Sequence, residues 1–128
     1  MSAPIASDNR TMTQTVLIVD DHPSFRSSAR RVLEDAGYDV VGEAPDGASA
    51  LAAAKELRPA VVLLDIQLPD LDGFEVAVRL TGDREPPAVV LTSSHDGSDF
   101  GDMITRCGAR GFLAKAELSG PSLAALLQ

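Results

Sequence analysis

The sequence predicts an α/β fold in which helices pack on both faces of a parallel sheet. Short apolar runs rich in β-branched residues alternate along the chain with segments whose apolar residues recur at helical spacing. Five runs of each kind follow one another, an alternation typical of strand–helix–strand units. Two of the middle apolar runs are nearly continuous, as in strands that are covered on both faces.

The first predicted strand and helix come after a polar stretch. Residues 1–14 show no apolar period and predict a disordered N-terminal tail. The strand spans residues 15–19, and the helix after it has one apolar face, made of Phe25, Ala29, Val32, Leu33 and Ala36. Pro23 suits the first turn of this helix, and Gly37 suits its end.

Two more strand–helix pairs follow. The second strand is predicted at residues 38–41 and the third at residues 60–64. Asp46 is the predicted N-cap of the helix between them, whose apolar residues are Leu51, Ala54 and Leu57. Asp72 is the predicted N-cap of the next helix, with three candidate apolar contacts, Phe74, Val78 and Leu80.

The last two pairs complete the predicted fold. Their strands span residues 88–91 and 111–113. The helix between them has one apolar face, made of Phe100, Met103, Ile104 and Cys107, and ends at Gly108. A short fifth helix spans residues 118–127. Because the sequence stops there, we expect one stand-alone domain of residues 15–128.

Composition and charge exclude several classes of protein. Of the 128 residues, 45% are hydrophobic and 23% charged, the mixture of a soluble globular domain. The net charge of −8 would repel a phosphate backbone, so we expect no direct nucleic-acid binding. A single cysteine, Cys107, excludes an internal disulfide framework and a cysteine-based zinc site. Because no apolar run could span a membrane and no secretory signal is present, we expect a cytoplasmic protein.

Polar residues follow the predicted strands at one edge of the sheet. They are Asp20 and Asp21 after the first strand, Asp65 after the third, Thr92, Ser93 and Ser94 after the fourth, and Lys115 after the fifth. Ligands of open parallel sheets bind at the carboxyl ends of the strands. The sequence therefore predicts a site where three carboxylates, a hydroxyl cluster and an ammonium group converge.

The clustered carboxylates favour a metal ion. Two like charges about 4 Å apart repel by about 4 kcal/mol at an effective dielectric constant of about 20. A divalent cation relieves this repulsion, and hard oxygen ligands with open water positions suit magnesium. Any one of these aspartates alone is better explained as a strand cap or a turn former. Their occurrence together with Lys115 favours a functional site.

These residues also carry a resemblance to a known family, the receiver domain of two-component response regulators. The acidic pair lies in Val19-Asp20-Asp21-His22-Pro23, and Asp65 begins a loop with Pro69 four and Gly73 eight residues later. A hydroxyl residue at the end of the fourth strand and Lys115 complete the pattern. The resemblance covers residues 15–127. It implies a flavodoxin-like (βα)5 doubly wound sandwich whose five-stranded parallel sheet has the order 2-1-3-4-5.

The resemblance implies that Asp65 accepts a phosphoryl group from the phosphohistidine of a histidine kinase or of a histidine phosphotransfer protein. Mg²⁺, for which Mn²⁺ can substitute, is held by the carboxylates of Asp21 and Asp65 and the backbone carbonyl of Gln67. Asp20 acts on the ion largely through water. Lys115 pairs first with Asp65 and then with a phosphoryl oxygen. The chain is then a signalling phosphoacceptor with self-phosphorylating chemistry, and not a metabolic enzyme.

The switch hydroxyl has two candidates in the sequence. Thr92 matches the motif by eye, whereas Ser93 lies 28 residues after Asp65 and 22 before Lys115, as in many receivers, and is our prediction. The resemblance implies that this hydroxyl donates to the phosphoryl group while Phe112 swings inward, although Phe112 also suits the core. The fourth helix, fifth strand and fifth helix then form the face that controls a partner protein or a phosphorylation-dependent homodimer.

Three other residues have smaller predicted roles. Gln67 and His95 are expected to flank the phosphoryl group and tune its hydrolysis. His22 is expected to belong to the turn into the first helix and not to a metal site. Receivers commonly follow the lysine with a cis-proline, but Ala116 follows Lys115 here, so no cis peptide is expected.

Three other functions remain open to the sequence. A phosphatase of the haloacid-dehalogenase type also uses a strand-end aspartate and magnesium, but it needs a second aspartate where this chain has Gln67. A degenerate receiver that acts as a constitutive protein-binding module is disfavoured by the intact set of Asp20, Asp21, Asp65 and Lys115. A phosphorelay shuttle is as compatible with these residues as an endpoint switch.

Overall fold

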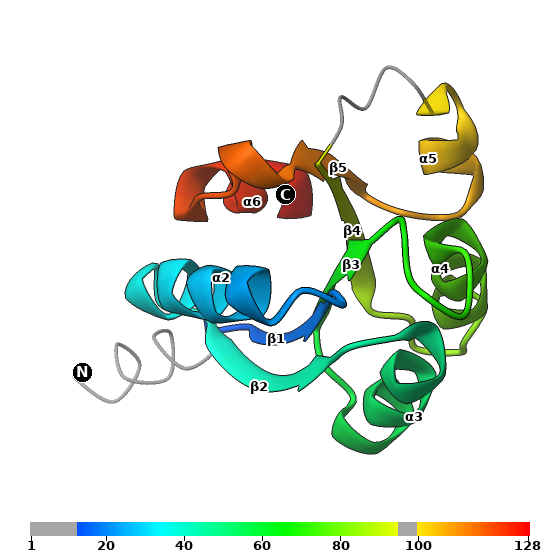
Figure 1. Cartoon of the computed structure of the whole chain (residues 1–128), viewed down its shortest axis with the longest axis horizontal. Helices are drawn as coiled ribbons and strands as arrows, with labels where there is room; N and C mark the ends of the chain where they lie inside the picture. Colours follow the sequence, from blue (N-terminus) through cyan, green and yellow to red (C-terminus); the bar gives the residue numbers. More distant parts are fainter. Residues whose placement is uncertain (1–12, 95–99) are drawn as a thin grey trace, which may run out of the picture.

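The computed structural model describes residues 13–94 and 100–128, and their arrangement is shown in Figure 1. A five-stranded parallel sheet forms the centre, with the order β2-β1-β3-β4-β5. Its strands are β1 (Thr15–Val19), β2 (Asp39–Ala44), β3 (Val61–Asp65), β4 (Ala88–Ser93) and β5 (Gly111–Ala114). The predicted fold class and strand order are confirmed.

Helices cover both faces of this sheet (Figure 1). They are α2 (Pro23–Asp35), α3 (Gly47–Leu57), α4 (Gly73–Thr81), α5 (Met103–Arg106) and α6 (Gly120–Leu127), with a 3₁₀ turn, η2 (Lys115–Glu117), after β5. Helices α2 and α6 lie on one side, and α3, α4 and α5 lie on the other. Successive strand residues alternate between two apolar cores, as Ile18 and Val19 do in β1. Because of this alternation, neighbouring residues at the end of a strand lie on opposite faces of the sheet.

The predicted helix caps are present. The Asp46 carboxylate accepts from the Ser49 N–H at 2.8 Å, and that of Asp72 accepts from the Phe74 N–H at 2.7 Å. The last helix begins at Gly120 and not at residue 118, because Ser119 and Ser122 form a reciprocal capping box. Leu118 and Ser119, which the prediction counted as helix, lie between the turn η2 and the first residue of α6.

Several predicted apolar contacts are wrong. Val78, Met103 and Leu57 are 53%, 45% and 40% exposed. Helix α4 buries a different set, made of Phe74, Val76, Ala77 and Leu80, so Val78 points to solvent. Regular α5 covers only part of the predicted 100–107 segment. Strand β4 continues through Thr92 and Ser93, which the prediction placed after the strand.

Three further predictions concern residues outside the described part of the chain, cis peptide bonds and membrane-spanning helices. Residues 1–12 of the predicted tail and His95 lie outside the described residues. The described part of the chain contains no cis peptide bond, as expected after Lys115. None of its helices has both the length and the apolar character needed to cross a membrane.

Candidate functional site

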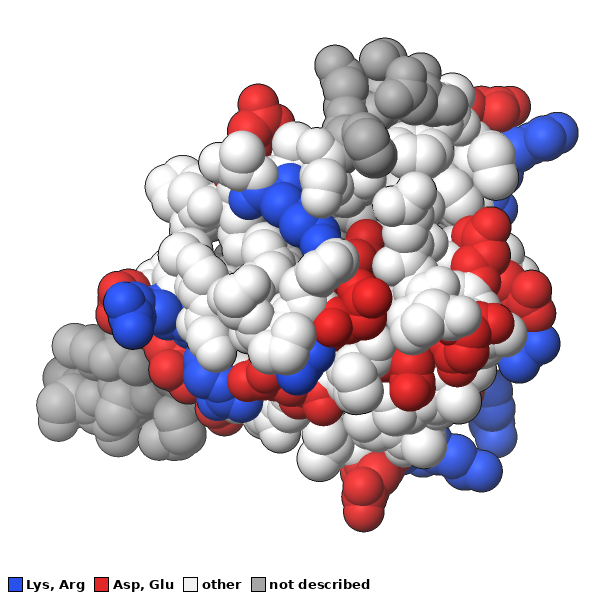
Figure 2. All heavy atoms as spheres, in the orientation of Figure 1, with Lys and Arg blue, Asp and Glu red and all other residues white. Residues whose placement is uncertain are grey.

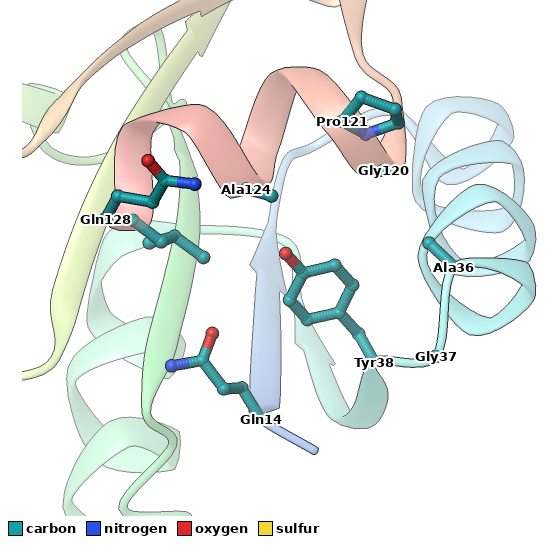
Figure 3. A pocket seen from close by; sticks show the side chains of 9 residues that line it. Gln14, Ala36, Gly37, Tyr38, Gly120, Pro121, Ala124 and Gln128 are labelled. Carbon is teal, nitrogen blue, oxygen red and sulfur yellow. The ribbon is translucent and has the colours of Figure 1, made fainter. Parts of the chain in front are cut away.

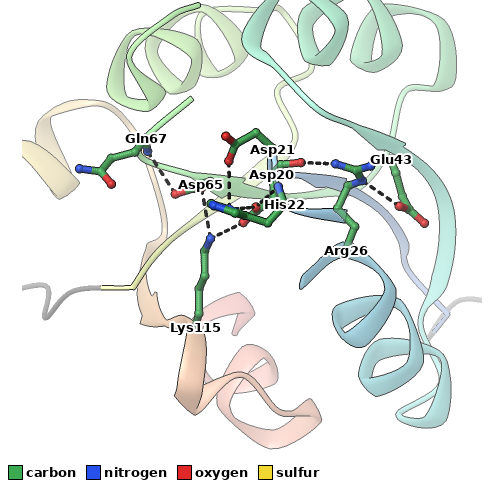
Figure 4. A network of polar contacts seen from close by, with 8 residues as sticks. All are labelled: Asp20, Asp21, His22, Arg26, Glu43, Asp65, Gln67 and Lys115. Carbon is green, nitrogen blue, oxygen red and sulfur yellow. Dashed lines mark hydrogen bonds and ion pairs between the residues drawn. The ribbon is translucent and has the colours of Figure 1, made fainter. Parts of the chain in front are cut away.

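Three of the predicted site residues meet at the carboxyl edge of the sheet (Figure 4). Asp20 follows β1, Asp65 ends β3, and Lys115 follows β5. Lys115 Nζ lies 2.6 Å from Asp20 Oδ2 and 3.3 Å from Asp65 Oδ2. Asp20 is completely buried, and Asp65 is 3% exposed. The ammonium group of Lys115 thus bridges two carboxylates that have been withdrawn from solvent.

Asp21 and His22 complete the group on its outer side. His22 Nδ1 lies 2.9 Å from Asp20 Oδ1 and 3.0 Å from Asp21 Oδ1, and the His22 N–H donates to Asp20 Oδ1 at 2.8 Å. Ligand atoms from these three residues and Asp65 all lie within 4.8 Å of one another. His22 therefore contacts the acidic pair, whereas the sequence assigned it to the turn alone. The sequence held one signal for this contact, because an aspartate side chain commonly accepts a hydrogen bond from the backbone N–H two residues later.

Burial and the contacts among the charged groups shift the pKa values of Asp65 and Lys115. Burial raises the pKa of Asp65, the Gln67 N–H at 3.1 Å opposes this rise, and the neighbouring Asp20 adds to it. Burial alone would lower the pKa of Lys115, but its contacts with Asp20 and Asp65 outweigh burial and raise it, so the ammonium stays charged. In Figure 2, red carboxylate atoms gather in the middle of the face shown.

Hydrogen bonds hold the loop between β3 and α4 at its base and at its tip. The Gly73 N–H donates to the Ile66 carbonyl at 2.8 Å, which closes the base of the loop. At its tip, the Asp70 carboxylate accepts from the Gly47 N–H at 2.7 Å and the Ala48 N–H at 3.0 Å. These hydrogen bonds lower the pKa of Asp70. The sequence did not single out Asp70, because this contact joins the loop to the start of α3, which is distant in the chain.

The loop presents the backbone of Gln67 to the site. In Figure 4 the Gln67 side chain points away from the carboxylates while its N–H faces Asp65. On the other side of the site, Lys115 Nζ lies 4.8 Å from the centroid of the Phe25 ring. Phe25 was predicted as a core residue of the first helix, and this cation–π contact was missed.

The two candidate hydroxyls point to opposite faces of the sheet. Thr92 is in register with Asp65 and Leu113, and Leu113 packs in the core beneath α2 and α6. Ser93 is in register with Ala114 and therefore shares the other face with Phe112. The Phe112 ring lies 5.9 Å from that of Phe100. Ser93, and not Thr92, is on the side of the sheet where a movement could reach Phe112.

Replacing Thr92 by Val is expected to raise the free energy of unfolding by about 1 kcal/mol. Thr92 Oγ1 is buried and has no hydrogen-bond partner among residues 13–94 and 100–128. Valine keeps the shape of the side chain and removes a hydroxyl that has lost its hydration. Urea titration of the two proteins measures the difference, and a less stable variant would show that the hydroxyl is hydrogen-bonded in solution.

A separate groove lies at the opposite, amino-terminal edge of the sheet, between the end of α2 and α6 (Figure 3). Its volume is about 580 Å³, and its lining includes Gln14, Tyr38, Pro121, Ala124 and Leu127. Burial raises the pKa of the Tyr38 hydroxyl, which therefore stays protonated. This lining has no carboxylate or ammonium side chain, so the chemistry described above belongs to the other edge.

Comparison with known proteins identifies relatives of this chain. It is 40% identical over 106 residues to the transcription regulator BvgA of Bordetella pertussis, a match that covers 83% of this chain and 51% of BvgA. A LuxR-family two-component response regulator from Aurantimonas matches in structure with a TM-score of 0.80 and 32% identity, covering 90% of this chain and 86% of that one. The chemotaxis response regulator CheY4 of Vibrio cholerae gives 0.77 and 29%, covering 91% and 98%.

The extent of these matches defines what they show. The chain spans about half the length of curated relatives such as BvgA. Residues 16–126, nearly all of the sheet and helices described above, match the family described as the response regulator receiver domain. Together with the strand order and the convergence of Asp20, Asp65 and Lys115, this match shows that the chain belongs to the receiver domain family of response regulators.

Proposed function

We propose that residues 15–128 work as a response regulator receiver whose Asp65 accepts a phosphoryl group in a Mg²⁺-dependent reaction. The observation that carries this proposal is the pair of contacts from Lys115 to the buried carboxylates of Asp20 and Asp65. Receiver domains interact with histidine kinases, so we propose a kinase or a histidine phosphotransfer protein as the donor. The proposed location is the cytoplasm, where response regulators typically work.

The acidic group has the donors that a hard divalent cation prefers. Receiver domains bind Mg²⁺ at an acidic pocket, and carboxylate and carbonyl oxygens are the preferred ligands of this ion. Burial raises the pKa of Asp65 and the neighbouring Asp20 adds to the rise, so a cation beside this carboxylate would favour its charged form. We propose that Asp21, Asp65 and the Gln67 carbonyl hold the ion, with Asp20 acting through water and Mn²⁺ as a substitute. Bound there, the ion supplies positive charge that neutralises phosphoryl oxygens.

The residues of the chain supply the other parts of the reaction. An oxygen of Asp65 forms a bond to phosphorus as the bond from phosphorus to the donor imidazole nitrogen breaks, and that nitrogen keeps the electron pair. Lys115 already contacts Asp65 and can pair with an oxygen of the transferred group. Its contact with Asp20 keeps it charged and in place. No acid–base residue is required for this step.

The proposed output is a change of the face made by α5, β5 and α6. Ser93 would donate its hydroxyl to the phosphoryl group, and Phe112 shares its side of the sheet. Phe112 lies partly buried against Phe100, which precedes α5. Movement of Ser93 can therefore be transmitted to the surface that binds a partner protein or a second copy. Because the chain carries a net charge of −8, we propose that these 128 residues do not themselves bind nucleic acid.

Incubation with acetyl phosphate and Mg²⁺ tests the proposed function directly. We expect a mass gain of one phosphoryl group that is absent with EDTA and is removed by hydroxylamine, which cleaves acyl phosphates. A phosphorelay shuttle would in addition pass the group to a histidine phosphotransfer protein. No mass gain in a folded protein that is supplied with Mg²⁺ would refute the proposal and favour a fixed protein-binding module.

A further inference from the structure

Arg26 of α2 lies beside the acidic pair without belonging to the set of residues predicted for the site (Figure 4). Its Nη1 donates to the backbone carbonyl of Asp20 at 2.6 Å, and its Nε donates to Glu43 Oε1 at 3.0 Å. The side chain is only 17% exposed. The guanidinium group is planar and carries its donors in a fixed fork, so one rigid group makes both contacts.

The carbonyl that Arg26 holds belongs to the peptide group between Asp20 and Asp21. The preceding peptide group is fixed by the sheet, because the Asp20 N–H donates to the Ala44 carbonyl at 3.0 Å. Asp21 lies beyond the end of the strand, and its carboxylate, which is 37% exposed, contacts His22. The orientation of the peptide group before Asp21 therefore governs where this carboxylate points, and Arg26 fixes that orientation.

Glu43 of β2 makes this arrangement compatible with a cation nearby. A positive charge close to a metal site is unfavourable on Coulombic grounds alone. Glu43 offsets the charge, with Oε1 on Arg26 and Oε2 on Arg30 at 2.7 Å. The hydrogen bond from Arg30 lowers the pKa of Glu43, which keeps this carboxylate ionised.

We propose that Arg26 is a positioning residue for the divalent cation, holding Asp21 through the Asp20 carbonyl while Glu43 neutralises the guanidinium charge. This inference rests on the proposed metal site. Positioning and electrostatics predict opposite effects when Arg26 is replaced by a neutral residue. Loss of a nearby positive charge would tighten metal binding, whereas loss of positioning weakens it by about tenfold, a typical cost of removing a group that orients a metal ligand.

Arg30 provides a matched control on the same helix. Arg30→Gln removes the same charge and one contact to Glu43 but leaves the Asp20 carbonyl held by Arg26. Titration calorimetry with Mg²⁺ and with Mn²⁺, without any phosphodonor, measures the affinities. We expect Arg26→Gln to weaken binding by about tenfold and Arg30→Gln to leave it nearly unchanged. Arg26→Lys, which keeps the charge but loses the fork, is also expected to weaken binding.

Urea unfolding in EDTA establishes whether each variant is folded. Unchanged or tighter binding by folded Arg26→Gln would overturn the inference, and so would equal weakening by Arg30→Gln. If Arg26→Gln does not fold, Arg26→Lys decides in the same way. Wild-type protein that binds neither metal would refute the proposed function and this inference together. Normal binding by the wild type with no effect of Arg26 refutes the inference alone.

Discussion

Asp65→Asn is expected to abolish phosphoryl uptake and, at the same time, to stabilise the folded protein. The amide cannot form the acyl phosphate, because its oxygen is a far weaker nucleophile than a carboxylate. The stability gain has a separate cause, since burial and the nearby Asp20 disfavour the charged form of Asp65. Lys115 keeps its shorter ion pair with Asp20, at 2.6 Å, when Asp65 is neutral. A gain of about 1 kcal/mol in the free energy of unfolding is expected.

The same cause predicts how this gain depends on pH. The pKa of Asp65 is raised from 3.8 in the folded state, so the folded protein holds this proton more tightly than the unfolded chain does. The contribution of Asp65 to stability therefore falls as the pH rises from below 3.8 through the folded pKa. Asp65→Asn has no titrating group at this position, so its stability does not fall in this way as the pH rises. In EDTA, the stability difference between variant and wild type should be small in acid and largest at neutral pH.

Two measurements and one control variant check this prediction. Mass spectrometry after incubation with acetyl phosphate and Mg²⁺ reports uptake, and urea titration across the pH range reports stability. Asp39→Asn is the control, because Asp39 is exposed on β2, away from the site, and both properties should stay at the wild-type level. Phosphorylation of Asp65→Asn at the wild-type rate would place the acceptor elsewhere.

The convergence of the site was predictable because it depends on topology. Once the chain is assigned to a parallel sheet, residues that follow the strands must reach the same edge. Asp20, Asp65 and Lys115 meet there even though the predicted strand ends differ from the observed ones by as much as three residues, as at β2. The direction of the strands is enough to predict this convergence, so small errors in the predicted strand ends do not change it.

Contacts that depend on local geometry were not predictable. Spacing favoured Ser93 over Thr92 as the switch hydroxyl, but which of the two shares a face with Phe112 follows only from the extent and register of β4 and β5. The contact of Arg26 with the Asp20 carbonyl depends on the path of the turn between β1 and α2. Val78 has the apolar character of a core residue, but the direction in which α4 packs leaves it exposed. Each of these features depends on how a strand, a turn or a helix is oriented in the folded protein, and composition and spacing do not encode that orientation.

Gly73→Ala is expected to lower the free energy of unfolding by about 3 kcal/mol and to weaken both Mg²⁺ binding and phosphoryl uptake. Gly73 is the first residue of α4, where a Cβ would contact the Asp65 carbonyl and lie 2.6 Å from Ile66 Cα and 2.7 Å from Ile66 O. These are backbone atoms, so no side-chain rotation can relieve the overlap. The strain must displace either α4 or the backbone of Asp65 and the loop that carries Gln67.

Intrinsic helix propensity predicts the opposite sign, because alanine in a helix is favoured over glycine by about 1 kcal/mol. Gly82→Ala is the control at the other end of α4, where the nearest atom to a Cβ, Val78 O, is 3.3 Å away, and a small effect is expected. Urea titration and Mg²⁺ calorimetry of both variants separate the two causes. If Gly73→Ala were as stable as the wild type and bound Mg²⁺ equally well, the close approach of α4 to Asp65 could not be what holds the acceptor carboxylate in place. If only Gly73→Ala loses stability and Mg²⁺ affinity, the close packing of the start of α4 against the Asp65 backbone is what holds the acceptor carboxylate in position.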